Sequence, residues 1–134
     1  MDRVEFSINA KKDLNEIKEN DPAAVAMILA TYSQMKLDPN LQDLLLERYR
    51  SEDGINISRW ISQYKRGNDL YRLKWVDFND SATCKYRVIY AYKPISIYNS
   101  EAEYRILAIV HRDKFDYTDE NEYTKRIIED YRNL

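Results

Sequence analysis

Three candidate strands follow one another in the second half of this chain, at about residues 70–78, 85–93 and 104–111. Apolar and polar side chains alternate along the first two, which is the period of a strand with two different faces. Consecutive strands joined by polar connections pair most simply as antiparallel hairpins. The chain is therefore predicted to fold around a sheet, and its helices must cover that sheet.

The first half of the chain predicts one short strand followed by helices. Residues 3–8 alternate apolar and polar side chains, as a half-buried strand does. Asn9 is the predicted cap of a helix that runs to about Asn20. Asp21 and Pro22 predict the start of a second helix, because proline lacks an N–H that the first helical turn would leave unpaired.

Three further elements are predicted to be helical. The pair Asp38-Pro39 repeats the start signal and predicts a short third helix. Apolar side chains at helical spacing predict a helix within residues 51–69, which Gly67 would end. These side chains are Ile57, Trp60, Ile61 and Tyr64. Thr118 is the predicted cap of a last helix. The apolar stripe of that helix comprises Tyr123, Ile127, Ile128 and Tyr131.

This order of one strand, two or three helices, three strands and a helix predicts an α+β fold. We expect a mainly antiparallel sheet of about four strands, with the helices packed on one face. The length of 134 residues predicts a single domain over residues 1–134, and 44% apolar residues are enough to build its core.

Cations interrupt the strands at positions that share one face. Arg72 and Lys74 alternate with the apolar side chains of the first strand, and Arg87 does so in the second. If the apolar faces pack under the helices, these three cations meet on the open face. An anion such as phosphate would relieve their mutual repulsion. A hydrated face that carries solvated charges is an equally simple interpretation.

The third strand ends in "VHRDKFDY" and adds further polar side chains. His111 and Arg112 fall at the strand end, and Tyr117 precedes the last helix. His111 is the only histidine, and an ordinary pKa of about 6.5 lets this residue exchange a proton near neutral pH. These three residues are therefore candidates for a site beside the strand cations.

The net charge of −2 does not suggest nucleic-acid binding, but the charge is unevenly distributed. Residues 59–117 carry a net +4, whereas residues 1–58 carry −4 and residues 118–134 carry −2. An anionic partner for the central segment is one explanation. Lysines and arginines on a solvated outer face are another.

Several classes of protein are disfavoured by the sequence. The single cysteine, Cys84, cannot form an internal disulfide and has no cysteine or histidine near it in sequence, so we assign it no metal-binding or nucleophilic role. We expect no metal and no cofactor. The longest apolar run, "AAVAMILA", is far shorter than the roughly 20 residues that span a bilayer. The N-terminal segment lacks the apolar stretch of a signal peptide. We expect a soluble, cytoplasmic protein without a membrane partner.

Three segments together resemble the RelE/ParE superfamily, the toxins of bacterial toxin–antitoxin pairs. They are "DLYRLKW", "CKYRVIYAY" and "YRILAIVHRDKFDY", and a helix follows the last one. The resemblance extends to the order of elements over nearly the whole chain and is close over residues 69–117. It implies a RelE-like fold and a cognate antitoxin that covers the basic surface.

In ribosome-dependent, RNA-cleaving members of this superfamily, basic strand residues act with an arginine and a tyrosine near the end. The matching positions here are Arg72, Lys74, Arg87, Arg112 and Tyr117, and His111 lies where several members carry a polar residue. The resemblance implies metal-independent cleavage of mRNA on the ribosome, in which the substrate's own 2′-OH attacks the adjacent phosphate. Such a reaction needs a base, charge stabilisation and an acid. The candidates are Lys74 as base, Arg87 and Arg112 for the charge, Tyr117 to orient the phosphate or stack a base, and His111 as acid.

The chain also departs from the family pattern, because family toxins are commonly smaller and distinctly basic. This chain is slightly acidic, and its segment at residues 38–67 looks longer than in the family pattern. Two alternatives therefore stay open. One is a ParE-like inhibitor of DNA gyrase that has no nuclease activity. The other is a non-toxic, protein-binding member of the same fold.

Overall fold

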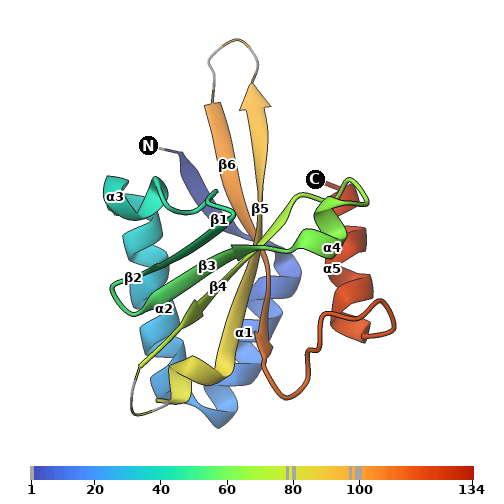
Figure 1. The fold of residues 1–134 in the computed structure, drawn as a ribbon. Helices are drawn as coiled ribbons and strands as arrows, with labels where there is room; N and C mark the ends of the chain where they lie inside the picture. Colours follow the sequence, from blue (N-terminus) through green and yellow to red (C-terminus); the bar gives the residue numbers. More distant parts are fainter. Residues whose placement is uncertain (1, 78, 80, 97, 99–100) are drawn as a thin grey trace.

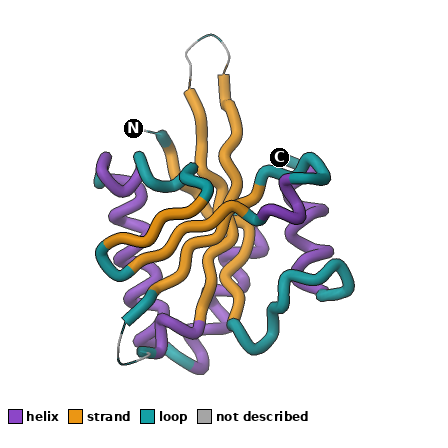
Figure 2. Tube along the Cα trace, in the orientation of Figure 1, coloured by secondary structure: helices purple, strands orange, loops and turns teal. Residues whose placement is uncertain are grey.

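The computed structural model describes residues 2–77, 79, 81–96, 98 and 101–134. Within these ranges the chain forms one six-stranded sheet, five α-helices and a short 3-10 helix (Figures 1 and 2). In chain order the elements are β1 (Arg3–Phe6), α1 (Ile8–Asn20), α2 (Pro22–Leu37), α3 (Pro39–Gln42), β2 (Tyr49–Glu52), β3 (Ile55–Arg59), α4 (Ile61–Tyr64), β4 (Leu70–Trp75), η1 (Ala82–Lys85), β5 (Tyr86–Ser96), β6 (Glu101–His111) and α5 (Glu122–Arg132).

The strands lie in the order β1-β6-β5-β4-β3-β2. Every neighbouring pair is antiparallel except β1 and β6, which run parallel. The predicted α+β class is confirmed, whereas the sheet is mixed and has six strands rather than about four. The additional strands come from the segment that the sequence pattern assigned to a helix.

That segment forms a hairpin because two residues between β2 and β3 adopt left-handed backbone conformations. Asp53 has φ of 50° and Gly54 has φ of 80°, which suits an Asp-Gly turn between antiparallel strands. Ile57 therefore lies in β3, opposite Leu73 of β4. The prediction of a helix that includes Ile57 is wrong, and only Ile61–Tyr64 is helical.

Two of the predicted helix caps are displaced. Ser7, not Asn9, caps α1, because the Ser7 hydroxyl accepts a hydrogen bond from the N–H of Ala10 at 3.1 Å. Asn121, not Thr118, caps α5. The predicted Asp21 cap with Pro22 in the first turn of α2 is confirmed.

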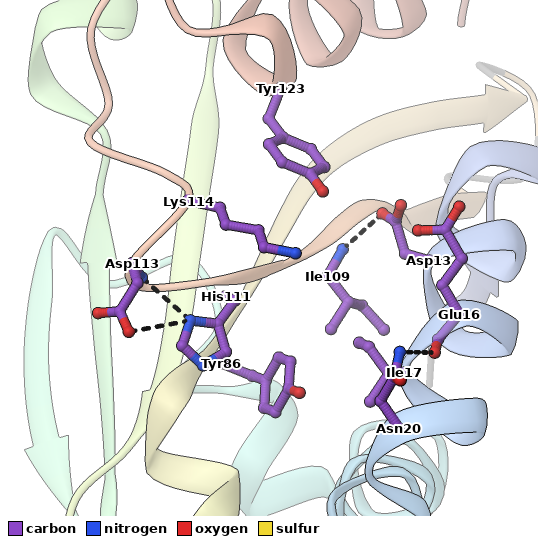
Figure 3. Close-up of a pocket in the computed structure, with 10 residues that line it drawn as sticks. All are labelled: Asp13, Glu16, Ile17, Asn20, Tyr86, Ile109, His111, Asp113, Lys114 and Tyr123. Atoms are coloured by element: carbon purple, nitrogen blue, oxygen red, sulfur yellow. Dashed lines mark hydrogen bonds and ion pairs between the residues drawn. The ribbon is translucent and has the colours of Figure 1, made fainter.

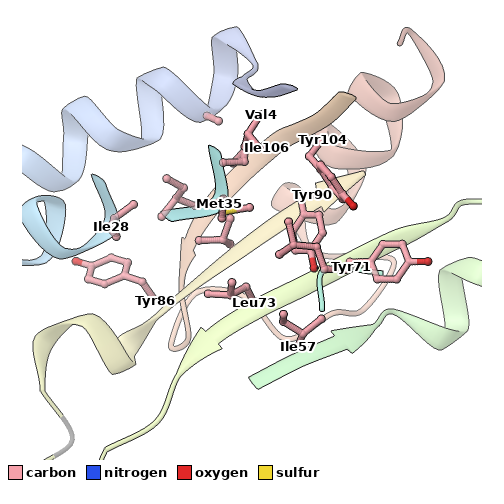
Figure 4. Close-up of a cluster of buried hydrophobic side chains, with 14 of the residues drawn as sticks. Val4, Ile28, Met35, Ile57, Tyr71, Leu73, Tyr86, Tyr90, Tyr104 and Ile106 are labelled. Atoms are coloured by element: carbon pink, nitrogen blue, oxygen red, sulfur yellow. The ribbon is translucent and has the colours of Figure 1, made fainter. Parts of the chain in front are cut away.

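The first core lies between the sheet and the helices α1 and α2, and Figure 4 shows part of it. Tyrosines fill much of this core. Tyr71 and Tyr90 stack with ring centroids 5.7 Å apart, and the Tyr90 hydroxyl donates to the carbonyl of Leu45 at 2.5 Å. Trp75 joins β4 to α2, because its Nε1–H donates to the Thr31 hydroxyl at 3.0 Å.

A second core lies on the opposite face of the sheet. Leu107 and Val110 of β6 pack there with Trp60, with Phe115 and with Ile127 of α5. The prediction that the helices cover one face is therefore wrong. β6 is apolar on both faces, so both need cover, and Leu107 is an extra residue at a β-bulge in its pairing with β5.

The cover on this second face is partial. The second core covers parts of β5 and β6 and Leu70 at the start of β4, whereas no helix of the described chain lies in front of β2, β3 and the rest of β4 in the view of Figure 1. Two cross-strand rows of polar side chains cross this uncovered part. One row is Ser51, Asn56, Lys74 and Arg87, and the other begins with Tyr49, Ser58 and Arg72. We call this surface the open face.

No helix in the described part of the chain is long and apolar enough to cross a membrane.

Candidate functional site

The register between β4 and β5 brings the strand cations together. Lys74 lies directly opposite Arg87, and Arg72 lies two residues earlier on the same side of β4. Directly opposed residues of an antiparallel pair have Cβ atoms roughly 5 Å apart. The alternation in the sequence predicted this arrangement, and the three side chains share the open face as expected.

Arg72 is held by a neighbour from β3. Its guanidinium donates a short hydrogen bond to the Oδ1 atom of Asn56, whose side chain is buried. The Nε atom of Arg72 is also buried, and its N–H donates no hydrogen bond within the described residues. Asn56 therefore fixes the direction of Arg72, while part of its donor capacity stays unused.

Lys74 is the cation with the most unfavourable surroundings. Burial lowers the pKa of its ammonium group from the ordinary value, and the positive charges of Arg72 and Arg87 lower it further. Among the residues that the structure describes, Lys74 makes no hydrogen bond or ion pair. A lysine with a lowered pKa is more often neutral near physiological pH and can then accept a proton.

Arg87 is anchored to the start of its own strand. Its Nη1 atom donates to the carbonyl of Cys84 at 2.7 Å and to the carbonyl of Tyr86 at 3.0 Å. Burial lowers the pKa of Arg87, and the nearby charges of Arg72 and Arg112 act in the same direction. The guanidinium still stays protonated at any physiological pH.

Arg112 arrives from the segment after β6. The backbone N–H of Arg112 donates to the carbonyl of Lys85 at 2.7 Å, which continues the β5–β6 pairing by one residue. Arg112, Lys74 and Arg87 line one hollow of about 160 Å³. Asp77 also lines this hollow, and hydrogen bonds from Ser81 lower the pKa of its carboxyl group.

Tyr117 is held in an unusual conformation beside this hollow. Its φ of 64° lies in the left-handed region, which is uncommon for a residue with a side chain. Its ring packs edge-on against Trp60 at 5.4 Å and tilted against Phe115 at 4.4 Å. The hydroxyl is buried without a hydrogen bond of normal geometry to any described residue, yet it lies close enough to Arg87 to raise the pKa of that guanidinium.

His111 is separated from this group. It pairs with Tyr86 across the β5–β6 ladder, and the two rings meet edge to face at 5.2 Å on the side of the first core. The Nδ1 atom of His111 accepts from the N–H of Asp113 at 3.1 Å. His111 lines another hollow, of about 490 Å³, with Lys114 and Glu16 (Figure 3).

The structure thus brings five of the six predicted residues to one place and leaves His111 on the opposite face. Arg87 faces the open side, so alternation along β6 places the partner of Arg87, Val110, and then Arg112 on that side. His111 lies between these two residues and points the other way. Adjacent residues of a strand project to opposite faces, so the sequence already indicated that His111 and Arg112 lie on different faces.

Sequence reasoning missed the residues that β2 and β3 contribute. Asn56 and Ser58 neighbour the cations on the open face, and Tyr49 stands at its edge. The Asp-Gly pair at residues 53 and 54, between two short alternating stretches, was the signal for the hairpin that carries them.

The open face can bind a group with several negative charges. Arg72, Lys74, Arg87 and Arg112 supply the positive charge, and a lysine with a lowered pKa adds a candidate proton acceptor. Within the described ranges, no group of three or more His, Cys, Asp or Glu side chains is placed to hold a metal ion.

No family model matches the chain, and neither does any curated protein or solved structure with which it was compared.

Proposed function

We propose that this chain is the toxin of a type II toxin–antitoxin pair and cleaves mRNA on the ribosome. The observation that carries the proposal is the open face, where Lys74, Arg87 and Arg112 line one hollow and Arg72 lies beside Lys74 on β4. The Asp77 carboxylate also lines this hollow, but Arg72, Lys74 and Arg87 leave the surface with more positive than negative charge, which attracts an anion. The phosphate backbone of RNA is an anion that single-stranded substrates present along an extended path.

The proposed reaction uses the 2′-OH of the substrate as the nucleophile. Lys74, in its neutral form, takes the 2′-OH proton, and the 2′-oxygen forms a bond to the adjacent phosphorus. The bond from phosphorus to the 5′-oxygen breaks, and that oxygen takes a proton as it leaves. The products are a 2′,3′-cyclic phosphate and a free 5′-OH end.

The remaining residues of the open face serve the charge that builds up on the phosphate. Arg87 and Arg112 line the hollow with Lys74, and Arg72 lies beside them. A guanidinium can donate two N–H groups to one phosphate, which stabilises negative charge on its oxygens. Because His111 lies on the other face, we assign the acid role to the Tyr117 hydroxyl near Arg87. This hydroxyl is buried in the free protein, so the role requires that RNA binding exposes it.

The toxin function also implies a protein partner. We expect a cognate antitoxin with an acidic segment that covers the open face and blocks RNA. Its affinity should fall as the salt concentration rises, because the attraction acts between exposed charges. Binding that does not depend on salt would contradict this part of the proposal.

The test is inducible expression in a bacterial host with sequencing of RNA 5′ ends. We expect growth arrest with new ends inside translated codons, and loss of both in Lys74→Ala. Lys11→Ala is the matched control, because Lys11 is an exposed lysine on α1, remote from the open face. Circular dichroism of both variants checks that the fold is intact.

Three other outcomes would contradict the proposed reaction. Arrest with intact transcripts and a DNA-damage response would indicate a gyrase inhibitor. The absence of arrest would indicate a non-toxic binding protein. Full cleavage by Lys74→Ala would remove Lys74 as the base.

A further inference from the structure

The open face continues past the five site residues onto the β2–β3 hairpin. Ser58 of β3 lies directly opposite Arg72, and Tyr49 of β2 lies directly opposite Ser58. Directly opposed side chains in a sheet project from the same face. These three residues therefore form one row that runs from the cations to the outer edge of the sheet.

Tyr49 is an exposed aromatic residue at the end of this row. Its side chain is 68% exposed, although β2 is paired along its whole length with β3. Its neighbours in the chain do not belong to this face. Arg50 and Glu52 project to the opposite side of the strand and pair with each other at 2.9 Å. Neither charge of this ion pair lies on the open face beside Tyr49.

A second hollow connects Tyr117 with this row. Its volume is about 210 Å³, and Ser58, Arg72 and Tyr117 contribute to its lining. Arg72 borders this hollow and lies beside Lys74 on β4, so the two hollows are neighbours on one face. Arg72 and Ser58 are both partly exposed, and the outer N–H groups of the guanidinium and the Ser58 hydroxyl suit a further phosphate or sugar oxygen.

The row extends over two strand spacings of the sheet. Neighbouring strands lie about 4.8 Å apart, so Tyr49 on β2 lies roughly 10 Å from Arg72 on β4. Proteins that bind single-stranded RNA combine a cationic track for the backbone with aromatic side chains on which bases stack. The open face has this composition from Arg112 to Tyr49.

We propose that Tyr49 stacks a base of the RNA whose cleaved phosphate lies at Lys74 and Arg87, with Ser58 and Arg72 between them binding its backbone. This inference rests on the proposed function, because it extends the same RNA across the sheet. An acidic protein segment could also use the cations. It would not need an unpaired aromatic ring at the edge, so RNA accounts for more of the face.

Binding can be measured without cleavage by removing the nucleophile. The probe is a fluorescein-labelled hexanucleotide with a 2′-O-methyl group on every sugar, and the readout is fluorescence anisotropy. Tyr49→Ala should weaken binding roughly 5- to 100-fold, the usual effect of losing one stacked base. Tyr49→Phe should retain the affinity, because stacking needs the ring and not the hydroxyl. Tyr98→Ala is the matched control, since Tyr98 is 90% exposed and lies between β5 and β6 in the chain.

The salt dependence separates stacking from charge. Tyr49→Ala should lower the affinity by the same factor at every salt concentration, whereas Lys74→Ala should also reduce the slope of affinity against salt. A variant with Tyr49→Trp gives an independent signal, because a stacked base should quench its added indole emission. Because Tyr49 is exposed, its replacement by alanine or by tryptophan should leave the fold intact.

Each result has a distinct meaning. Unchanged affinity in Tyr49→Ala with weakened binding in Lys74→Ala would overturn this inference and leave the proposed function standing. Unchanged affinity in both variants would overturn both. Equal losses in Tyr49→Ala and Tyr98→Ala would overturn the placement of the base on the open face. A polyglutamate peptide provides the last test. If it displaces the probe, and if it binds the Tyr49→Ala variant less tightly than the wild-type protein, Tyr49 belongs to a site for a protein partner instead.

Discussion

Replacing Lys74 by methionine should stabilise the protein, although the same change abolishes the proposed reaction. Lys74 lies opposite Arg87 and next to Arg72 on one face of the sheet. Two unit charges about 7 Å apart repel each other by about 0.6 kcal/mol in water and about 2.4 kcal/mol in a half-buried setting. Like charges directly opposed in a sheet are destabilising on the scale of about 0.2–1 kcal/mol. We therefore expect Lys74→Met to raise the free energy of unfolding by about 1 kcal/mol.

The sign follows from the direction of the pKa shift. The pKa of Lys74 is lower in the folded protein than in the unfolded chain, mainly because of burial and then because of Arg72 and Arg87. Folding therefore disfavours the charged form, and this penalty is fully present below the folded-state pKa. As pH rises above the unfolded value of about 10.4, both states are neutral and the penalty disappears. The stabilisation by Lys74→Met should be full below the folded-state pKa of Lys74 and should fade as the lysine titrates.

Thermal unfolding at low and high salt measures this effect. A gain of about 1 kcal/mol corresponds to a rise in Tm of roughly 3–5 °C for a chain of this size. The rise should shrink in about 1 M salt, where charges are screened within about 3 Å. Lys11→Met removes an exposed lysine from α1 and should change Tm by little at either salt concentration. A lower Tm for Lys74→Met would refute the reasoning, and a gain that salt leaves unchanged would refute the part played by Arg72 and Arg87 and leave burial as the cause.

Three further changes test other parts of the structure. Asp13→Ala should lower the free energy of unfolding by about 3 kcal/mol in urea denaturation, because buried Asp13 accepts from Arg126 at 2.6 Å and from the N–H of Ile109 at 3.0 Å. Adding Arg126→Met should recover part of that loss. Tyr117→Phe should change stability by less than about 0.5 kcal/mol, because the lost hydroxyl has no hydrogen bond among the described residues. The same variant should slow cleavage at least about 100-fold if the hydroxyl is the acid. Gly54→Ala should lower the free energy of unfolding by about 1 kcal/mol, because φ is 80° there, while the added Cβ would meet its nearest atom only at 3.7 Å.

The sequence was most informative where a pattern had a single structural interpretation. β4 and β5 were predicted because apolar and polar side chains alternate along them with a period of two residues, which fits a strand and not a helix. The β2–β3 hairpin was missed because Ile57, Trp60 and Ile61 satisfy a helical spacing as well as a strand. Pairing of β3 with β4 decides between the two, and a local pattern does not contain that pairing.

The candidate site was predictable to the same extent. The shared face of Arg72, Lys74 and Arg87 follows from alternation within two adjacent strands. The position of Tyr117 beside Arg87 depends on the path of residues 112–121. The left-handed backbone conformation of Tyr117 could not be predicted, because a tyrosine does not favour a positive φ. The role of Tyr49 needed both the hairpin and its register with β3.

The site lies where it does because the two ends of one sheet face differ in polarity. β6 and part of β5 are apolar there, so α5 and Phe115 must cover them. β4 and β3 present Lys74 and Ser58 on the same face, so that cover cannot extend across them without burying charge. Asp13 of α1 joins α5 to β6, because it pairs with Arg126 of α5 and accepts from the backbone N–H of Ile109 in β6. The segment between β6 and α5 is thereby held at the boundary between the covered and the open part, where it delivers Arg112 and Tyr117 to the cations. A change that loosens α5 should therefore disturb the proposed active site through this segment, even though no residue of α5 lines either hollow.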